Sequence, residues 1–238
     1  MSVIFKREFR SYFQNVTGFV FIAVYILIAG AFITLYNFFS FNSSISYAVS
    51  DLMLWGAPLI PILTMNVIAK DRKSGAYQLL YSLPLRSSDI ILGKYFAMLV
   101  VFAIPTAFLA LMPLIFNFMG EVNYLVSYTS IICFFLFGAA LIAVCTFVSS
   151  LSDNVILSAV FNYITVAALI ALYMVKPLIA LLPAGEIITK ILSVFDIFGK
   201  FESFVYGIFD IKAIIYYLSV SALFVFLSVR LFERKRLM

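Results

Sequence analysis

The sequence predicts an all-α integral membrane protein, a bundle of six transmembrane helices in one domain, on two observations. Of the 238 residues, 65% are hydrophobic and 11% are charged, whereas a soluble domain is typically about 45–50% apolar and about 25% charged. In addition, six long charge-free runs follow one another along the chain, and about 20 apolar residues cross a bilayer core as a helix. The bilayer is therefore the expected solvent of this protein.

The expected elements, in chain order, cover residues 1–238. Residues 1–16 should form an N-terminal helix lying in the membrane interface, because Ile4/Phe5, Phe9 and Tyr12/Phe13 share one helical stripe; a basic tail is the alternative. The six spans are expected at residues 18–39, 52–69, 92–118, 124–150, 154–175 and 213–232. Residues 70–91 form a cytoplasmic segment between spans 2 and 3, and residues 176–212 an external apolar segment before the last span.

The distribution of Lys and Arg predicts the orientation. Six spans place both termini on the same side, and cytoplasmic loops carry an excess of positive charge. Twelve of the sixteen basic residues lie in the two termini and the segment between spans 2 and 3: Lys6, Arg7, Arg10, Lys70, Arg72, Lys73, Arg86, Lys94, Arg230, Arg234, Lys235 and Arg236. Both termini should therefore be cytoplasmic, in a multi-pass protein of the cell membrane. The net charge of +5 would anchor it to anionic lipid; no basic groove outside the spans suggests nucleic acid.

Proline and glycine interrupt two of the expected spans. Gly56, Pro58 and Pro61 fall in the second span, and Pro105 and Pro113 in the third. Proline removes a backbone hydrogen bond and kinks a helix, so these spans could splay or line a pathway. Ordinary structural kinks are an equal alternative.

Small residues give the fourth span one distinctive face. Gly138, Ala139, Ala140 and Ala143 lie close together in this span. Small side chains let helix backbones approach closely in a membrane. We therefore expect tight helix packing here.

The segment between spans 2 and 3 predicts a short amphipathic helix. Within Gly75–Leu83, the apolar residues Ala76, Leu79, Leu80 and Leu83 recur at helical spacing. Pro84 ends this helix, because the residue before a proline avoids the helical region. The helix could rest on lipid or dock on a partner, and the pattern alone leaves both open.

The same segment resembles a known family. The motifs Asp71-Arg72-Lys73-Ser74-Gly75, Leu79-Leu80-x-Ser82-Leu83-Pro84-Leu85 and Asp89-Ile90-x-x-Gly93-Lys94 are similar to those of ABC-2 type transporter permeases. The stretch Phe201-Glu202-Ser203-Phe204-x-x-Gly207-x-x-Asp210 resembles the gliding-motility-type branch. The resemblance implies a coupling helix that docks on an ATP-hydrolysing subunit through Asp71, Arg72, Lys73, Gly75, Tyr77, Gln78, Leu79, Leu80, Leu83 and Pro84.

Three positions depart from that family pattern. Family members often have Glu where this chain has Asp71 and Gln78, and a His is expected around Gly199. The first two departures bear on salt bridges to the ATPase. The third bears on the chemistry of the external segment.

The expected function is therefore that of a permease subunit of an ATP-driven exporter. The chain lacks a GxxxxGK[ST] phosphate loop, so no cofactor is expected in it, and ATP and Mg would bind a partner ATPase. Six spans are half of a transport pathway in that family, which implies a second permease copy or a related permease. The alternatives are a secondary transporter or channel without an ATPase, and an intramembrane enzyme. The enzyme is disfavoured because the chain has no His and no carboxylate pair at membrane depth.

Overall fold

A computed structural model of the chain describes residues 1–40, 44–65, 86–118, 121–180 and 185–236. In these ranges the chain is helical and contains no strand. Six of the described helical stretches are long and apolar enough to cross a membrane: Val16–Phe39, Ser46–Thr64, Ser87–Phe116, Tyr124–Leu151, Val155–Ile179 and Ile211–Lys235. The protein is therefore a multi-pass membrane protein, as its composition predicts.

The first half of the chain contains one helix outside the spans and three helical spans. The elements are α1 (Ser2–Gln14), α2 (Val16–Ile33) with a π-helical continuation η1 (Thr34–Phe39), α3 (Ser46–Gly56), the 3₁₀ turn η2 (Ala57–Leu59), α4 (Ile60–Thr64) and α7 (Ser87–Phe116). The second span is therefore composite, because α3, η2 and α4 follow one another without a gap. Pro58 lies within η2 and Pro61 lies in the first turn of α4, where a missing N–H costs least.

The second half contains the other three spans and the segment between the fifth and sixth of them. Its elements are α8 (Tyr124–Leu151), α9 (Val155–Ile179), α10 (Gly185–Leu192), η3 (Gly199–Phe201), α11 (Glu202–Val205) and α12 (Ile211–Arg236). The side chain of Asn123 caps α8 by accepting from the Val126 N–H, and Asn154 caps α9 by accepting from the Ile156 N–H. These caps fix where the fourth and fifth spans begin.

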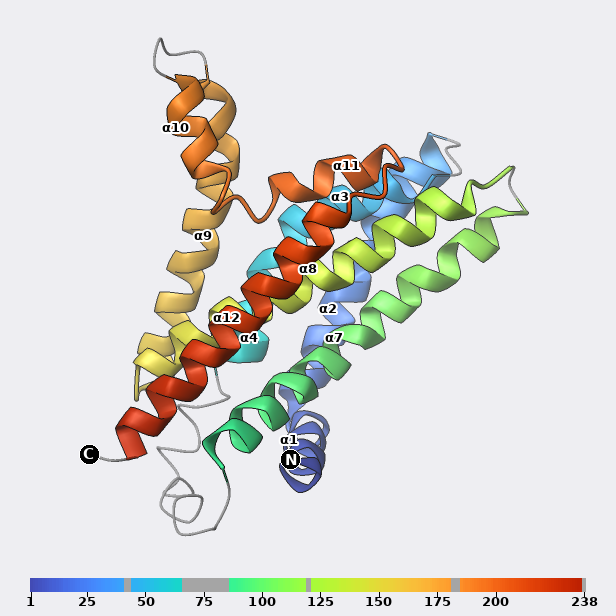
Figure 1. Ribbon diagram of the computed structural model, residues 1–238. Coiled ribbons are helices and arrows are strands. Elements are labelled where there is room, and N and C mark those ends of the chain that lie inside the picture. Colours follow the sequence, from blue (N-terminus) through green and yellow to red (C-terminus); the bar gives the residue numbers. More distant parts are fainter. Residues whose placement is uncertain (41–43, 66–85, 119–120, 181–184, 237–238) are drawn as a thin grey trace.

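Helix α8 is the centre of the bundle. It packs against α4, α7, α9 and α12, and Phe134, Phe137 and Ala140 on it are buried. Helix α9 diverges from the other spans (Figure 1) and leaves most of its apolar side chains exposed, among them Phe161 and Ile164. The core thus lies between α2, α3, α7, α8 and α12, and α9 presents its apolar surface outward.

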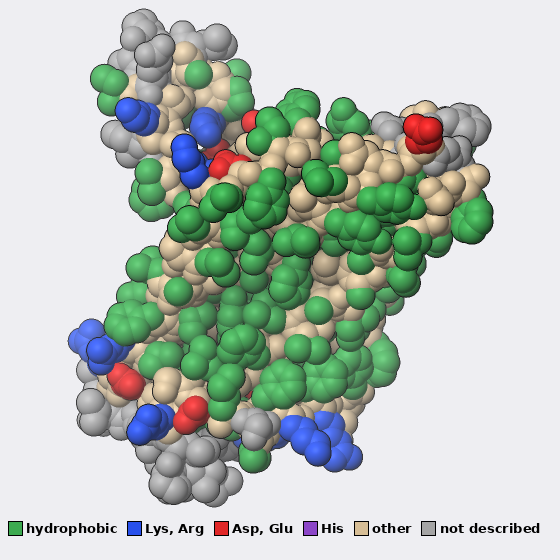
Figure 2. Space-filling model, turned by 45° about the vertical axis from the view of Figure 1, so that its right-hand side comes forward, with side chains coloured by type: hydrophobic (Ala, Val, Ile, Leu, Met, Phe, Trp, Pro, Cys, Tyr) green, Lys and Arg blue, Asp and Glu red, His purple; other side chains and the backbone are tan. Residues whose placement is uncertain are grey.

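Charged side chains lie at the two ends of the bundle. Figure 2 shows hydrophobic side chains over the middle of the molecule, with Lys and Arg above and below them. Helix α1 and the last turn of α12 lie at the same end (Figure 1), which we call the terminal end. The other is the opposite end. This pattern matches an apolar belt between two polar interfaces.

The helices extend further than the charge-free runs. The second span begins at Ser46 rather than 52, the third at Ser87 rather than 92, and the fifth ends at Ile179 rather than 175. Each extension passes an acidic or basic residue, and such residues have partners: Asp51 accepts from the Tyr36 hydroxyl at 2.5 Å, and Lys176 lies 2.7 Å from Asp196. A paired charge near an interface does not end a helix, so runs without charge underestimate helix length.

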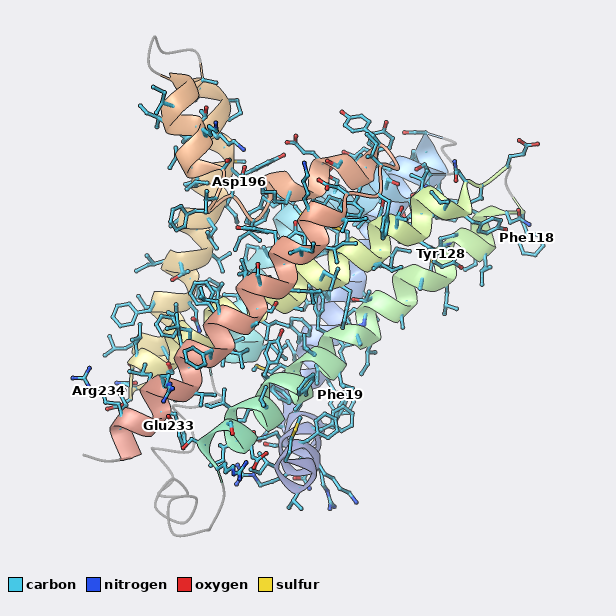
Figure 3. The ribbon with its side chains drawn as sticks, in the orientation of Figure 1. Phe19, Phe118, Tyr128, Asp196, Glu233 and Arg234 are labelled. Atoms are coloured by element: carbon cyan, nitrogen blue, oxygen red, sulfur yellow. The ribbon has the colours of Figure 1, made fainter. Side chains whose placement is uncertain are left out.

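The connection between α9 and α12 is partly folded into the bundle. The short helices α10 and α11 form there. Phe198, Phe201 and Phe204 are buried, and the Phe198 ring contacts Phe137 of α8 at 5.1 Å between centroids. Asp196, labelled in Figure 3, is 1% exposed; it pairs with Lys176 and accepts from the Gly199 N–H at 2.8 Å. These contacts hold the connection between α9 and α12 against the opposite end.

Candidate functional site

The predicted coupling residues lie outside the described part of the chain. This holds for Asp71, Arg72, Lys73, Gly75, Tyr77, Gln78, Leu79, Leu80, Leu83 and Pro84, all within residues 66–85. The structure describes the two helices that border this segment: α4, which ends at Thr64, and α7, which begins at Ser87. The candidate site is therefore built from these two helix ends and from α1, which contacts both.

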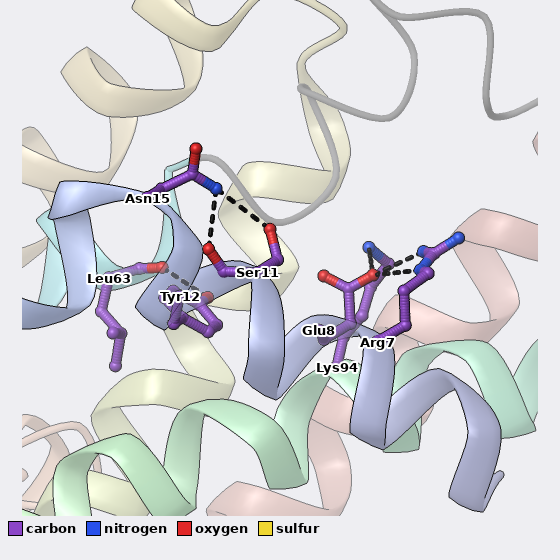
Figure 4. Close-up of polar contacts among 7 residues, drawn as sticks. All are labelled: Arg7, Glu8, Ser11, Tyr12, Asn15, Leu63 and Lys94. Atoms are coloured by element: carbon purple, nitrogen blue, oxygen red, sulfur yellow. Dashed lines mark hydrogen bonds and ion pairs between the residues drawn. The ribbon is translucent and has the colours of Figure 1, made fainter.

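Tyr12 connects α1 to the end of α4. Its hydroxyl donates to the backbone carbonyl of Leu63 at 2.9 Å (Figure 4). The last four carbonyls of a helix have no intrahelical partner, so Tyr12 satisfies one of them. Burial raises the pKa of Tyr12 well above its usual value, and the negative charge of Glu8 raises this pKa further. Tyr12 is therefore a hydrogen-bond donor throughout the physiological pH range.

Glu8 connects α1 to the start of α7. The Lys94 ammonium lies 3.1 Å from Glu8 Oε1, and the two side chains are 2% and 13% exposed. The Arg7 guanidinium also donates to the same oxygen, with Nε at 3.2 Å (Figure 4). Removing one partner of a buried ion pair costs about 3–5 kcal/mol, because the other charge stays desolvated. Helix α1 is therefore fastened to α7 by charge as well as by apolar contact.

Glycine allows α1 and α7 to approach closely. A Cβ on Gly93 would lie 3.0 Å from Ile4 Cγ2 and 3.3 Å from the Phe5 backbone nitrogen. Ile4 and Tyr12 of the predicted apolar stripe are buried, and Phe5, Phe9 and Phe13 are partly buried. The predicted stripe therefore exists and faces the bundle; whether α1 also lies in a membrane interface remains a prediction.

A buried polar cluster lies beside the end of α4. It consists of Thr64 (α4), Ser149 (α8), Ser158 and Asn162 (α9), all fully buried. Ser149 donates to the Thr64 carbonyl at 3.1 Å, and Asn162 Nδ2 donates to Ser149 Oγ at 2.7 Å and to Thr64 Oγ1 at 3.2 Å. The other amide atom, Asn162 Oδ1, is buried and has no hydrogen-bond partner among the residues that the structure describes. The cluster links the helix before segment 66–85 to two further spans.

The proline and glycine positions fall into two groups. In the second span, Gly56 and Pro58 lie at the α3–η2–α4 break, and the Tyr25 hydroxyl would be 2.6 Å from a Cβ on Gly56. In the third span, Pro105 and Pro113 are inside α7, which continues through both. The break in the second span is the more pronounced irregularity, and it lies three helical turns or less from segment 66–85.

The sequence alone does not predict the partners in the Glu8–Lys94 ion pair or in the buried polar cluster at Thr64. The sequence places Lys94 in a family motif and among the basic residues that set the orientation, but it does not indicate Glu8 as the partner of Lys94, and no pattern marks Thr64 or Asn162. One signal was available: Glu8 is the single acid among four charged residues between positions 6 and 10, which marks it as a residue with a specific basic partner.

Comparison with known proteins does not assign the chain to a family. No protein-family model matches the chain. No curated protein matches it either. Within the described ranges, no three His, Cys, Asp or Glu side chains lie close enough together to hold a metal ion. The functional argument therefore rests on the geometry of the terminal end and on the sequence motifs.

Proposed function

We propose that this protein is the membrane-spanning permease subunit of an ATP-binding-cassette exporter of the ABC-2 type. In this proposal it forms half of a translocation pathway, and a separate ATPase subunit binds the coupling segment 70–91. The observation that carries the proposal is the position of α1. It bonds to α4 through Tyr12 and Leu63 and to α7 through Glu8 and Lys94. Helix α1 therefore acts as a brace, that is, one helix bonded to both helices that border the segment.

This arrangement suits the transmission of force from a soluble partner. A push on residues 75–83 would reach the membrane through α4 and α7. Because α1 is bonded to both, the two helices would move together, and the Thr64 cluster would carry the displacement to α8 and α9. Rigid-body motion of packed helices about an interface is an established form of switching, and it requires no chemistry in this subunit.

The proposal includes the partners and the location. The partners are an ABC ATPase, which would bind ATP and Mg, and a second copy of this chain or a related permease. The protein would lie in the cell membrane with the terminal end in the cytoplasm. The Lys and Arg residues of α1 and of the end of α12 support this orientation.

Replacing the apolar face of the coupling helix tests the proposal. Leu79→Asp with Leu80→Asp should abolish co-purification of the ATPase while the permease inserts at normal levels, because apolar anchors in a groove contribute about 2 kcal/mol or more each. Gln78→Asp, which adds charge off the apolar stripe, is the matched control and should have a milder effect than the double variant. Intact complex formation and ATP hydrolysis in the double variant would contradict the proposal.

One observation favours a second candidate function, a secondary transporter or channel. The second span contains a 3₁₀ turn and two prolines, and interrupted spans form ion and substrate sites in secondary transporters. Transport by the purified chain in vesicles, driven by an ion gradient without ATP or a partner, would select this alternative. Transport only with the ATPase and ATP would exclude it.

A further inference from the structure

A groove opens between the start of α7 and the end of α12. Its volume is about 490 Å³, within the roughly 300–1,000 Å³ range of small-molecule sites. Its walls are hydrocarbon: Leu92 from α7, and Ala222, Val225, Phe226 and Val229 from α12. Such walls suit an apolar chain.

The end of the groove carries one cation and one anion. Arg230 and Glu233 line it, with Arg230 Nη1 at 3.4 Å from Glu233 Oε2 and side chains 65% and 41% exposed. The Arg230 guanidinium lies over the Phe226 ring, 5.1 Å from its centroid, a cation–π contact that orients it. Ser88, in the first turn of α7, adds a hydroxyl. Both charges are accessible and face the same opening.

The length of the groove matches one leaflet. From Ala222 to Arg230, α12 rises about 12 Å at 1.5 Å per residue, and half of a hydrocarbon core is about 15 Å. The charged pair therefore lies at interface depth when the apolar wall lies among acyl chains. A molecule that fills the groove must be apolar for most of its length and charged at one end.

The charges select among lipid heads. A phosphate accepts two parallel hydrogen bonds from a guanidinium, and a primary ammonium can donate to the Glu233 carboxylate. A head with phosphate alone would satisfy Arg230 but lie against the negative charge of Glu233. A quaternary ammonium would have no N–H to donate to this carboxylate.

We propose that this groove binds a zwitterionic glycerophospholipid with a primary ammonium head, such as phosphatidylethanolamine. Its phosphate lies on Arg230, its ammonium on Glu233, and an acyl chain on Leu92, Val225 and Val229. The bound lipid differs from the lipids of the surrounding bilayer because Arg230 and Glu233 bind its head group specifically. The site is independent of ATP-driven transport and of any partner subunit.

Lipid competition on the full chain tests the proposal. The detergent-purified protein is mixed with equal amounts of phosphatidylethanolamine, phosphatidylglycerol and phosphatidylcholine of identical acyl chains, and bound lipid is counted by native mass spectrometry. We expect one retained phosphatidylethanolamine per chain, preferred about tenfold, which corresponds to about 1.4 kcal/mol and is a typical contribution of one charge-assisted hydrogen bond. Equal retention of the three lipids, or preference for phosphatidylglycerol, would overturn the proposal.

Four variants assign the contacts. Glu233→Gln should remove the preference for phosphatidylethanolamine over phosphatidylcholine, and Arg230→Gln should lower retention of all three phospholipids. Ala222→Trp should reduce retention without changing head preference, because the indole fills the groove. Arg234→Gln is the control for charge, since Arg234 points away from α7 whereas Glu233 lies on the side of α7 (Figure 3). An equal effect of Arg230→Gln and Arg234→Gln would also overturn the site.

Discussion

Gly138 of α8 lies directly against the ring of Phe102 of α7. A Cβ on Gly138 would be 2.1 Å from Phe102 Cε1. The ring has little room to move, because it also packs against Tyr25 and Phe134 with centroids 5.7 and 5.6 Å away. The close packing of α7 against α8 therefore requires a glycine at position 138, because a larger residue would overlap the Phe102 ring.

Gly138→Ala should accordingly destabilise the bundle. Overpacking a well-packed core costs typically about 1–3 kcal/mol. An overlap as close as 2.1 Å belongs at the upper end of this range, above the roughly 1 kcal/mol that alanine gains over glycine in helix propensity. We expect a lower thermal midpoint in detergent. Gly30→Ala is the matched control: a Cβ there meets nothing within 4 Å, so its midpoint should stay level or rise. A rise at both positions would contradict the close approach.

The Glu8–Lys94 pair should behave as a coupled unit. Glu8→Gln and Lys94→Met should each lower the thermal midpoint, with a loss of about 3 kcal/mol of stability, because each removes one charge of the buried Glu8–Lys94 ion pair. The double variant should lose less than the sum of the two, and the non-additivity measures the pair. Lys6→Gln, an exposed charge change on the same helix, should have little effect. Additive losses would show that the two residues act independently.

Asn162 and Ser149 should differ in their contribution to stability. Asn162→Leu removes two hydrogen bonds but also the unpaired Oδ1, so the free energy of unfolding should change by less than about 1 kcal/mol. Ser149→Ala removes the donor to the Thr64 carbonyl and the acceptor of Ser158 and Asn162, and should cost about 2 kcal/mol or more. Denaturation in mixed micelles measures both. A larger loss for Asn162→Leu would mean that Oδ1 has a donor in the membrane.

The orientation predicts opposite labelling of two engineered thiols. In intact cells, an impermeant thiol reagent should label Lys200→Cys and should not label Ser2→Cys, since the Lys and Arg distribution places position 2 in the cytoplasm. The native Cys133 and Cys145 are buried, and the unsubstituted protein gives the background. Labelling at position 2 from outside would reverse the topology and remove the basis for the coupling segment.

Periodicity and composition predict the helices better than they predict the contacts between them. The six spans, the apolar stripe of α1 and the small residues of α8 follow from local pattern, and Gly138 of this small face packs directly against the Phe102 ring. The bonds at the terminal end join residues far apart in sequence: 86 positions separate Glu8 and Lys94, and 98 separate Thr64 and Asn162. A lone Asn or Lys in an apolar run reveals that it needs a partner, but not which one.

The brace formed by α1 imposes an order on biosynthesis. Helix α1 leaves the ribosome before its partners, because Leu63 and Lys94 follow Tyr12 and Glu8 by 51 and 86 positions. Until α7 has been translated, Glu8 lacks Lys94, and the apolar stripe of α1 has no α7 to cover it. A chaperone or the insertion machinery would therefore meet α1 uncovered while three spans are being made. Docking of α1 would mark the moment at which the amino-terminal half becomes a native unit.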